Sequence, residues 1–247
     1  MLPDATLCNM PRDESSPTTW GDMNGKPLIL GALLLAWIAL IAGGSGLKMA
    51  HGLRAGAVAT GAPAVLGEED RGRFLQRTGQ SALLVFLHPR CPCSRATLEQ
   101  LERVGKIAEA ESAANTPPSI HLLIVTPPGA EEGWERGDIL ARARRLDGAV
   151  VSLDREGALA QRFSARTSGQ VFLYDQSGAL QFAGGITPAR GQAGDPRQAR
   201  ALWNLIRGES GEMTEAPVFG CPLFHSSDLA CSGSGPDHTG LECCSRP

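Results

Sequence analysis

The chain has 247 residues, a net charge of −3 at neutral pH, 42% hydrophobic residues and 5% aromatic residues. Its length fits one mid-sized domain with extensions or two small domains. The near-neutral charge and the absence of a Lys/Arg run argue against nucleic acid as a partner. Few aromatic residues beside 30 glycines favour a small α/β core with long flanks.

Residues 1–26 are polar, with Pro, Ser, Thr and Asp, and we expect them to be disordered. Residues 27–47 are apolar over the roughly 20 residues that cross a bilayer, which predicts an uncleaved membrane anchor. A cleaved signal peptide stays an alternative, because the run up to Ala42 has the length of a signal core and small residues follow it. A start at Met23 instead of Met1 would give a compact, positively charged leader, and N-terminal sequencing distinguishes the two.

Charge does not orient the anchor, because two basic residues lie on each side of it, Arg12 and Lys26 before and Lys48 and Arg54 after. The number and grouping of the cysteines do indicate an orientation. The six cysteines beyond the anchor form an even, clustered set, as disulfide frameworks often do: Cys91, Cys93, Cys221, Cys231, Cys243 and Cys244. Such sets belong in oxidising compartments. We therefore expect the N-terminus in the cytoplasm and the rest of the chain outside it.

After a Gly/Ala linker over residues 48–63, periodic structure predicts one domain over residues 64–209. Its predicted elements are a helix beginning near residue 69, strand 82–87, helix 93–110, strand 120–125, helix 136–146, strand 149–153, helix 157–163, a hairpin of strands 170–174 and 179–183, and helix 196–206. This order favours an α/β fold, a mixed sheet with helices on both faces. Residues 210–247 form a Cys-, Gly- and Ser-rich tail that we expect to be disordered.

A dithiol lies where strand 82–87 runs into the first long helix. Cys91 would cap this helix and Cys93 would lie in its first turn, where the helix dipole and unpaired N–H groups stabilise a thiolate. Arg90 and Arg95 add positive potential. We expect a lowered pKa for Cys91, which is the candidate nucleophile, while Cys93 is the candidate resolving thiol. An inert pair of buried cysteines is the alternative.

The spacing of the pair constrains its disulfide. Side chains two residues apart on a helix diverge by roughly 200°, so a bond needs Cys91 outside the regular helix. A strained disulfide is more easily reduced, and therefore more oxidising, than an unstrained one. A third thiol, Cys221, lies in the apolar stretch 218–224, which could dock on the domain. We hypothesise that Cys221 comes to the pair and resolves a mixed disulfide.

Metal binding is an alternative use of the same residues. His88 with Cys91 and Cys93 would make a soft three-ligand site suited to Cu(I) or Zn(II). A histidine at this point can instead cap the strand end or tune the thiol. In the tail, zinc-finger spacing is absent. The tail cysteines therefore favour one or two disulfides over metal capture.

The stretch Phe86-Leu87-His88-Pro89-Arg90-Cys91 resembles the Phe-x-x-Pro-x-Cys of thioredoxin-like proteins, above all the membrane-tethered thiol-disulfide proteins of bacterial envelopes. More closely, residues 88–97, 167–169, 173–175, 184–187 and 220–224 resemble RedB proteins. The resemblance, which covers about residues 64–224, implies a thioredoxin-like fold and thiol-disulfide exchange without a cofactor. It implies a single-pass protein of the bacterial inner membrane with a periplasmic domain, whose partners are protein thiols and disulfides of the envelope.

Two positions depart from the thioredoxin pattern. Ser94 occupies the slot of the second cysteine, and Gly169 occupies that of the cis-proline that faces the dithiol. Gly169 is either a turn glycine with positive φ or a gap whose N–H is left for a substrate backbone or a metal. Ser168 beside it is a turn serine or a hydrogen-bond donor to the thiolate. Copper-handling proteins of this fold use two cysteines and a histidine at other spacings, so a copper metallochaperone is the alternative function.

Overall fold

The computed structural model describes residues 25–57, 59–75, 79–111, 117–209 and 213–224, with the backbone alone for 25–27 and 104–111. The chain divides into two units, residues 1–48 and 49–247. The predicted N-terminal disorder and most of the predicted tail lie outside the described residues.

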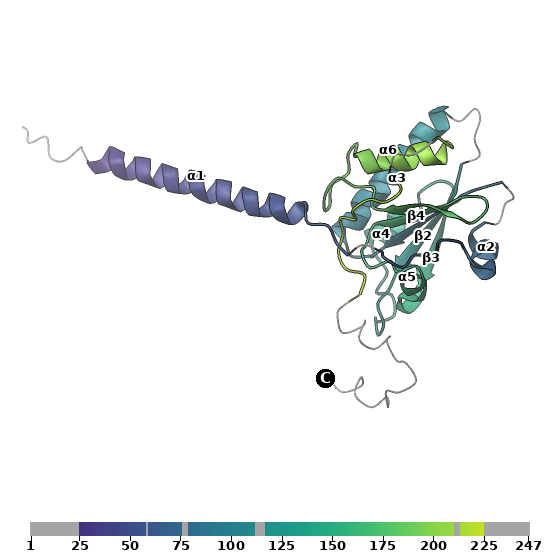
Figure 1. The fold of residues 1–247 in the computed structure, drawn as a ribbon. Coiled ribbons are helices and arrows are strands. Elements are labelled where there is room, and N and C mark those ends of the chain that lie inside the picture. Colours follow the sequence, from purple (N-terminus) through teal and green to yellow (C-terminus); the bar gives the residue numbers. More distant parts are fainter. Residues whose placement is uncertain (1–24, 58, 76–78, 112–116, 210–212, 225–247) are drawn as a thin grey trace, which may run out of the picture. The chain divides into compact units, whose positions relative to one another are not determined.

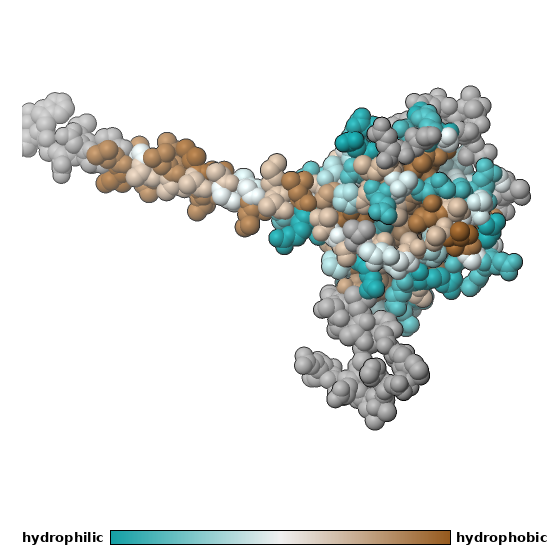
Figure 2. Space-filling view, in the orientation of Figure 1, coloured by the Kyte–Doolittle hydropathy of each residue, from teal (hydrophilic) through white to brown (hydrophobic). Residues whose placement is uncertain are grey.

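Helix α1 (Gly25–Gly52) contains the apolar run and extends it by about one turn beyond the predicted residue 47. Its segment Leu28–Gly52 is long and apolar enough to cross a membrane, a property that signal sequences share. The visible surface of α1 in Figure 2 is mostly apolar. Because its large side chains, such as Leu30 and Leu40, are exposed within this single chain, an apolar environment outside the chain is their natural partner.

Five strands form one mixed sheet in the order β3-β2-β1-β4-β5. These strands are β1 (Ala82–Leu87), β2 (Ser119–Val125), β3 (Ala149–Asp154), β4 (Gln170–Tyr174) and β5 (Leu180–Gly184). β1, β2 and β3 are parallel, whereas β4 is antiparallel to both β1 and β5. Every residue of the central β1 is buried, because helices cover both faces, and this explains its unbroken apolar sequence.

The helices divide between the two faces of the sheet (Figure 1). One face packs against α3 (Pro92–Glu111), α4 (Asp138–Ala143) and α6 (Arg197–Ile206). The other face packs against α2 (Glu68–Phe74) and α5 (Ala158–Arg162), which follows a 3-10 turn at Arg155–Gly157. The predicted mixed sheet with helices on both faces is confirmed, and the predicted elements of the domain agree with the observed ones to within a few residues.

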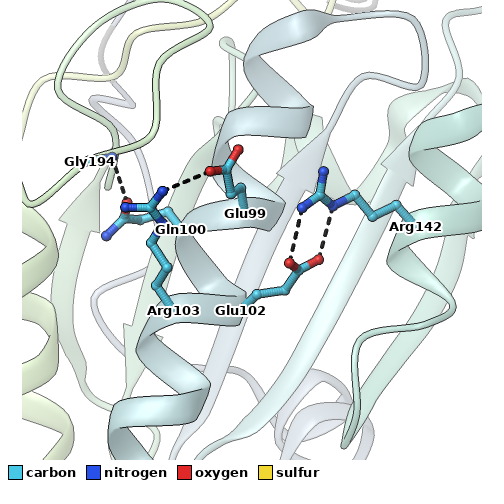
Figure 3. A network of polar contacts seen from close by, with 6 residues as sticks. All are labelled: Glu99, Gln100, Glu102, Arg103, Arg142 and Gly194. Carbon is cyan, nitrogen blue, oxygen red and sulfur yellow. Dashed lines mark hydrogen bonds and ion pairs between the residues drawn. The ribbon is translucent and has the colours of Figure 1, made fainter.

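Polar contacts hold α3, the helix that begins at the dithiol (Figure 3). Arg142 of α4 donates two hydrogen bonds to the carboxylate of Glu102, with Nε–Oε1 and Nη2–Oε2 distances of 2.9 and 3.0 Å. The backbone N–H of Gly194 donates to Oε1 of Gln100 at 3.1 Å. A bidentate pair fixes geometry more firmly than a single contact. The orientation of α3 is thus tied both to α4 and to the loop that follows β5.

The segment after α6 returns across the domain, and we call residues 214–224 the strap. Near its start, the N–H of Ala183 in β5 donates to the carbonyl of Thr214 at 2.9 Å, and the N–H of Ala216 donates back to Ala183 at 3.1 Å. Near its end, the side chains of Leu223 and Phe224 are buried in the apolar layer that α2 and α5 cover. The strap, which the sequence assigned to the tail, therefore packs on the domain.

A three-thiol candidate site

Three parts of the fold converge at one edge of the sheet. β1 ends there and leads through residues 88–90 to Cys91 and α3. β4, which is antiparallel to β1, begins at the same edge, with Gln170 opposite Phe86. The strap passes the start of β4, because the N–H of Ser168 donates to the carbonyl of Cys221 at 2.8 Å. Strand direction therefore brings together residues that are far apart in the sequence.

The sulfurs of Cys91, Cys93 and Cys221 all lie within 4.8 Å of one another. All three residues are thiols rather than disulfides. Cys91 is 2% exposed and Cys93 is 3% exposed, whereas Cys221 is only half-buried. The predicted approach of Cys221 to the pair is thus present in the structure, and Cys221 is the most exposed of the three thiols.

Hydrogen bonds to its sulfur lower the pKa of Cys91 to about 4. The largest contribution comes from the thiol of Cys93, and the thiol and backbone N–H of Cys221 and the N–H of Cys93 add to it, while burial opposes them. The expected donation from the first turn of α3 is therefore present. Hydrogen bonds to the charged form stabilise a thiolate, so Cys91 is the sulfur of the cluster that ionises first.

The other two thiols keep their protons more firmly. The pKa of Cys93 is raised, first because its thiol proton is donated to Cys91 and then by burial. Burial and the hydrogen bond to Cys91 raise the pKa of Cys221 to about 11, although the charge of Arg190 acts in the opposite direction. In the reduced cluster, the Cys91 thiolate therefore accepts hydrogen bonds from the thiols of Cys93 and Cys221.

A loop that the sequence did not single out completes the cluster. The N–H of Gly191 donates to the sulfur of Cys93, and the neighbouring Arg190 supplies the positive charge near Cys221. Both residues follow β5, in a glycine-rich stretch without a strong sequence signal. Only the sheet order, which places β5 beside β4, brings this loop to the thiols.

Two serines behind the dithiol form a buried network. The hydroxyls of Ser94 and Ser168 are 2.7 Å apart. Ser94 Oγ donates to the carbonyl of His88 at 2.7 Å, and the N–H of His88 reaches both hydroxyl oxygens at 3.1 Å. Ser168 therefore holds the loop before Cys91. The described hydrogen bonds of the Ser168 hydroxyl go to this network rather than to a thiolate, and Ser94 fills the slot of the usual second cysteine as a structural residue.

Gly169 adopts φ +89°, in the region that favours glycine. Its N–H donates to the carbonyl of Phe86 at 2.8 Å, so the expectation of an N–H left for a substrate or metal is wrong for this structure. A Cβ at this position would lie 2.8 Å from Oγ1 of Thr97. The turn-glycine interpretation therefore explains Gly169, and the described residues contain no cis peptide bond.

The charged and aromatic neighbours of the dithiol face mainly one another. The ring of His88 meets that of Trp134 edge-on at 5.0 Å, and its Nδ1 accepts from the N–H of Arg90 at 3.1 Å. The guanidinium of Arg90 lies over the Trp134 ring at 4.8 Å, while Arg95 forms an ion pair with Asp138. The lowered pKa of Cys91 comes from thiol and N–H donors, and a contribution of Arg90 and Arg95 stays a prediction.

As a candidate metal site, the cluster differs from the predicted one. Within the described parts of the chain, the group of side chains with suitable ligand atoms consists of Cys91, Cys93 and Cys221, without His88. Three thiolates are soft ligands that favour Cu(I) over hard cations. The donor set thus fits a soft metal, with Cys221 in the place expected for the histidine.

Comparison with known proteins rests on structure, since no family model and no curated protein matches the sequence. A hypothetical protein from Sinorhizobium meliloti 1021 superposes with a TM-score of 0.50 at 17% identity, over 70% of this chain and 98% of that protein. A secreted Mycobacterium tuberculosis disulfide oxidoreductase homologous to DsbE of E. coli gives a TM-score of 0.36 at 14% identity over 63% and 96%. A SCO1/SenC family lipoprotein from Bacillus anthracis gives 0.40 at 11% identity over 54% and 83%.

The domain has a thioredoxin-like fold by its own topology, a β3-β2-β1-β4-β5 sheet with antiparallel β4 and β5 and with the dithiol between β1 and α3. The fold predicted from the Phe-x-x-Pro-x-Cys resemblance is confirmed at this level, and the nearer resemblance to RedB proteins stays a prediction. At such identities the likeness concerns the fold alone. The chemistry of this thioredoxin-like domain must therefore be argued from its own residues.

Proposed function

We propose that the domain carries out thiol-disulfide exchange, with Cys91 as the nucleophile and Cys93 as the partner thiol. The observation that carries the proposal is a group of three thiols, two of them buried, mutually within 4.8 Å, in which the residue before α3 is the one that ionises first. The thiolate is the reactive form of cysteine. The donors directed at the sulfur of Cys91 keep it in this form.

The reaction proceeds in two displacements at sulfur. The Cys91 thiolate attacks one sulfur of a substrate disulfide, which forms a mixed disulfide and releases the other sulfur as a thiolate. A second thiol of the cluster loses its proton and attacks the sulfur of Cys91, which releases the remaining substrate thiolate. The substrate gains two electrons and the cluster becomes a disulfide. In the opposite direction the same steps oxidise a substrate dithiol.

We place this activity at a bacterial inner membrane, with α1 as a single-pass anchor and the domain in the periplasm. The apolar length of α1 and the cysteine content of the chain support this placement. The partners would be protein thiols and disulfides of the envelope, and the exchange needs no cofactor.

A redox titration of the full chain in detergent tests the function. The protein is equilibrated in glutathione buffers, and its thiols are counted by the mass shift on alkylation. We expect one reversible two-electron couple, more oxidising than the roughly −270 mV of thioredoxin, that is lost in Cys91→Ser. If no disulfide involving Cys91 forms at any glutathione ratio, the proposal is wrong.

Binding of one Cu(I) is the second candidate function, because three sulfur ligands already lie together. Competition with a chromophoric Cu(I) chelator measures it. Cys221→Ser should weaken binding at least tenfold, while His88→Ala should leave it unchanged. If His88→Ala weakened binding equally, the ligand set would be the one expected from the sequence. If the unaltered protein did not compete with the chelator for Cu(I), a copper role would be excluded.

A further inference from the structure

We infer that Cys221, rather than Cys93, forms the disulfide with Cys91 during turnover, so that the strap is a working part of the site. This inference rests on the proposed thiol-disulfide exchange and reassigns its second step. It follows from how the strap is fixed, from the geometry of the three thiols and from their exposure.

Backbone pairing on both sides fixes the position of Cys221. The N–H of Gly56 donates to the carbonyl of Val218 at 2.8 Å, and the N–H of Leu223 donates to the carbonyl of Arg166 at 2.9 Å. Pro222 pairs with Thr167 in an antiparallel bridge. These bonds involve neither α3 nor its first turn. The sulfur of Cys221 is therefore brought to Cys91 by a segment other than the helix that carries Cys93.

The strap passes so close to the start of β4 that only glycine fits at one point. A Cβ on Gly220 would lie 1.8 Å from the carbonyl oxygen of Ser168, far inside any van der Waals contact. A side chain there would force the strap outward and withdraw the neighbouring Cys221 from Cys91. Glycine at position 220 therefore allows the strap to lie close to the three thiols.

A disulfide between Cys91 and Cys93 is constrained in a way that one between Cys91 and Cys221 is not. Only Pro92 separates Cys91 from Cys93, and Cys93 already belongs to the first turn of α3, where Oγ1 of Thr97 donates to its carbonyl at 3.0 Å. A disulfide needs a specific torsion about its S–S bond and a fitting direction of both Cβ atoms. Cys221 approaches from a separate segment, so its backbone can adjust to these demands without unwinding the helix.

Exposure gives the order of events. Within the cluster, Cys91 is 2% exposed, whereas Cys221 is partly accessible. A substrate disulfide reaches Cys91 only when the strap shifts, which also removes Cys221 from the attacking thiolate. When the strap returns, Cys221 meets the mixed disulfide, and the charge of Arg190 favours its ionised form.

The step balances as a single displacement. Cys221 loses its proton to solvent, and its sulfur attacks the sulfur of Cys91. The bond between Cys91 and the substrate breaks, and the substrate sulfur leaves as a thiolate. The product is a Cys91–Cys221 disulfide that ties the strap to the start of α3. Cys93 keeps its role as the donor that stabilises the Cys91 thiolate.

The test uses the full chain in detergent, with its four other cysteines replaced by serine. Oxidised glutathione is the probe, and mass spectrometry without reduction locates every disulfide. We expect the Cys91–Cys221 pair to be the main product. In Cys221→Ser, the Cys91–glutathione adduct should persist at least tenfold longer than in the parent, and in the matched variant Cys93→Ser it should resolve to the Cys91–Cys221 disulfide.

Gly220→Ala keeps all three thiols and forces the strap and the carbonyl of Ser168 apart. It should slow resolution of the adduct as Cys221→Ser does. A Cys91–Cys93 disulfide as the main product, with a persistent adduct in Cys93→Ser alone, would overturn the inference while leaving thiol-disulfide exchange intact. Failure of glutathione to form any adduct at Cys91 would instead count against the proposed function itself.

Discussion

The reactivity of Cys91 should be nearly independent of pH between 5 and 8. With its pKa lowered to about 4, the ionised fraction changes only from about 0.9 to about 1 over this range. An ordinary thiol, with a pKa of 9.0, would rise from about 10⁻⁴ to about 0.1, roughly a thousandfold. Burial of Cys91 slows its reaction at every pH alike, so it does not change the shape of the rate–pH profile on which this comparison depends.

Cys93→Ala is the perturbation that tests the cause. It removes the largest contribution to the lowered pKa, the thiol that donates to the sulfur of Cys91. The pKa of Cys91 should rise, and a steep rate increase with pH should appear within the range in which the unaltered protein is flat. Removing a hydrogen bond to the charged form raises the pKa of an acidic group.

The assay is alkylation of the reduced protein by iodoacetamide, followed by quantification of the Cys91 peptide by mass spectrometry. The alkylated peptide should be absent in Cys91→Ser, which assigns the signal to Cys91. Cys221→Ala provides a second variant, since Cys221 also donates to this sulfur, and it should shift the profile in the same direction. If the rate at Cys91 in the unaltered protein rises tenfold per pH unit from 5 to 8, the hydrogen-bonded thiolate does not exist.

Three further predictions concern stability. Because hydrogen bonds lower the pKa of Cys91 in the folded protein, the unfolded chain binds an extra proton above that lowered pKa, so the free energy of unfolding of the reduced protein should rise from pH 5 to pH 8; a flat urea-denaturation profile would contradict this. Gly169→Ala, at φ +89° and against a threonine hydroxyl, should cost about 2–3 kcal/mol, and more than the control Gly148→Ala, which has positive φ in open space. Ser168→Ala should cost about 1–3 kcal/mol in the same assay, because it leaves the buried partners of its hydroxyl, Ser94 and the N–H of His88, with fewer bonds; a neutral effect would mean that the network is not needed.

Local sequence was sufficient to predict the helices and strands and to place the dithiol at the start of a helix. An unbroken apolar strand, two cysteines and an amphipathic helix are neighbours in the chain, so their order alone placed Cys91 at a helix N-terminus. The N–H donation from Cys93 followed from the same local geometry. Gly169 was left open between two uses, because whether its N–H is paired depends on the adjacent β1 rather than on its own neighbours.

Contacts between segments far apart in the chain decided which other side chains lie beside the dithiol. His88 lies next to the dithiol in sequence, yet its ring meets Trp134, while Cys221 lies far along the chain and its sulfur is within 4.8 Å of those of Cys91 and Cys93. The sequence identified Cys221 as a thiol in an apolar stretch, but the tertiary structure alone showed which carbonyls pair with that stretch and that Gly220 permits the close approach. The reason is physical: helices and turns depend on residues a few positions apart, whereas the proton order of three thiols depends on distances that only the packed sheet establishes.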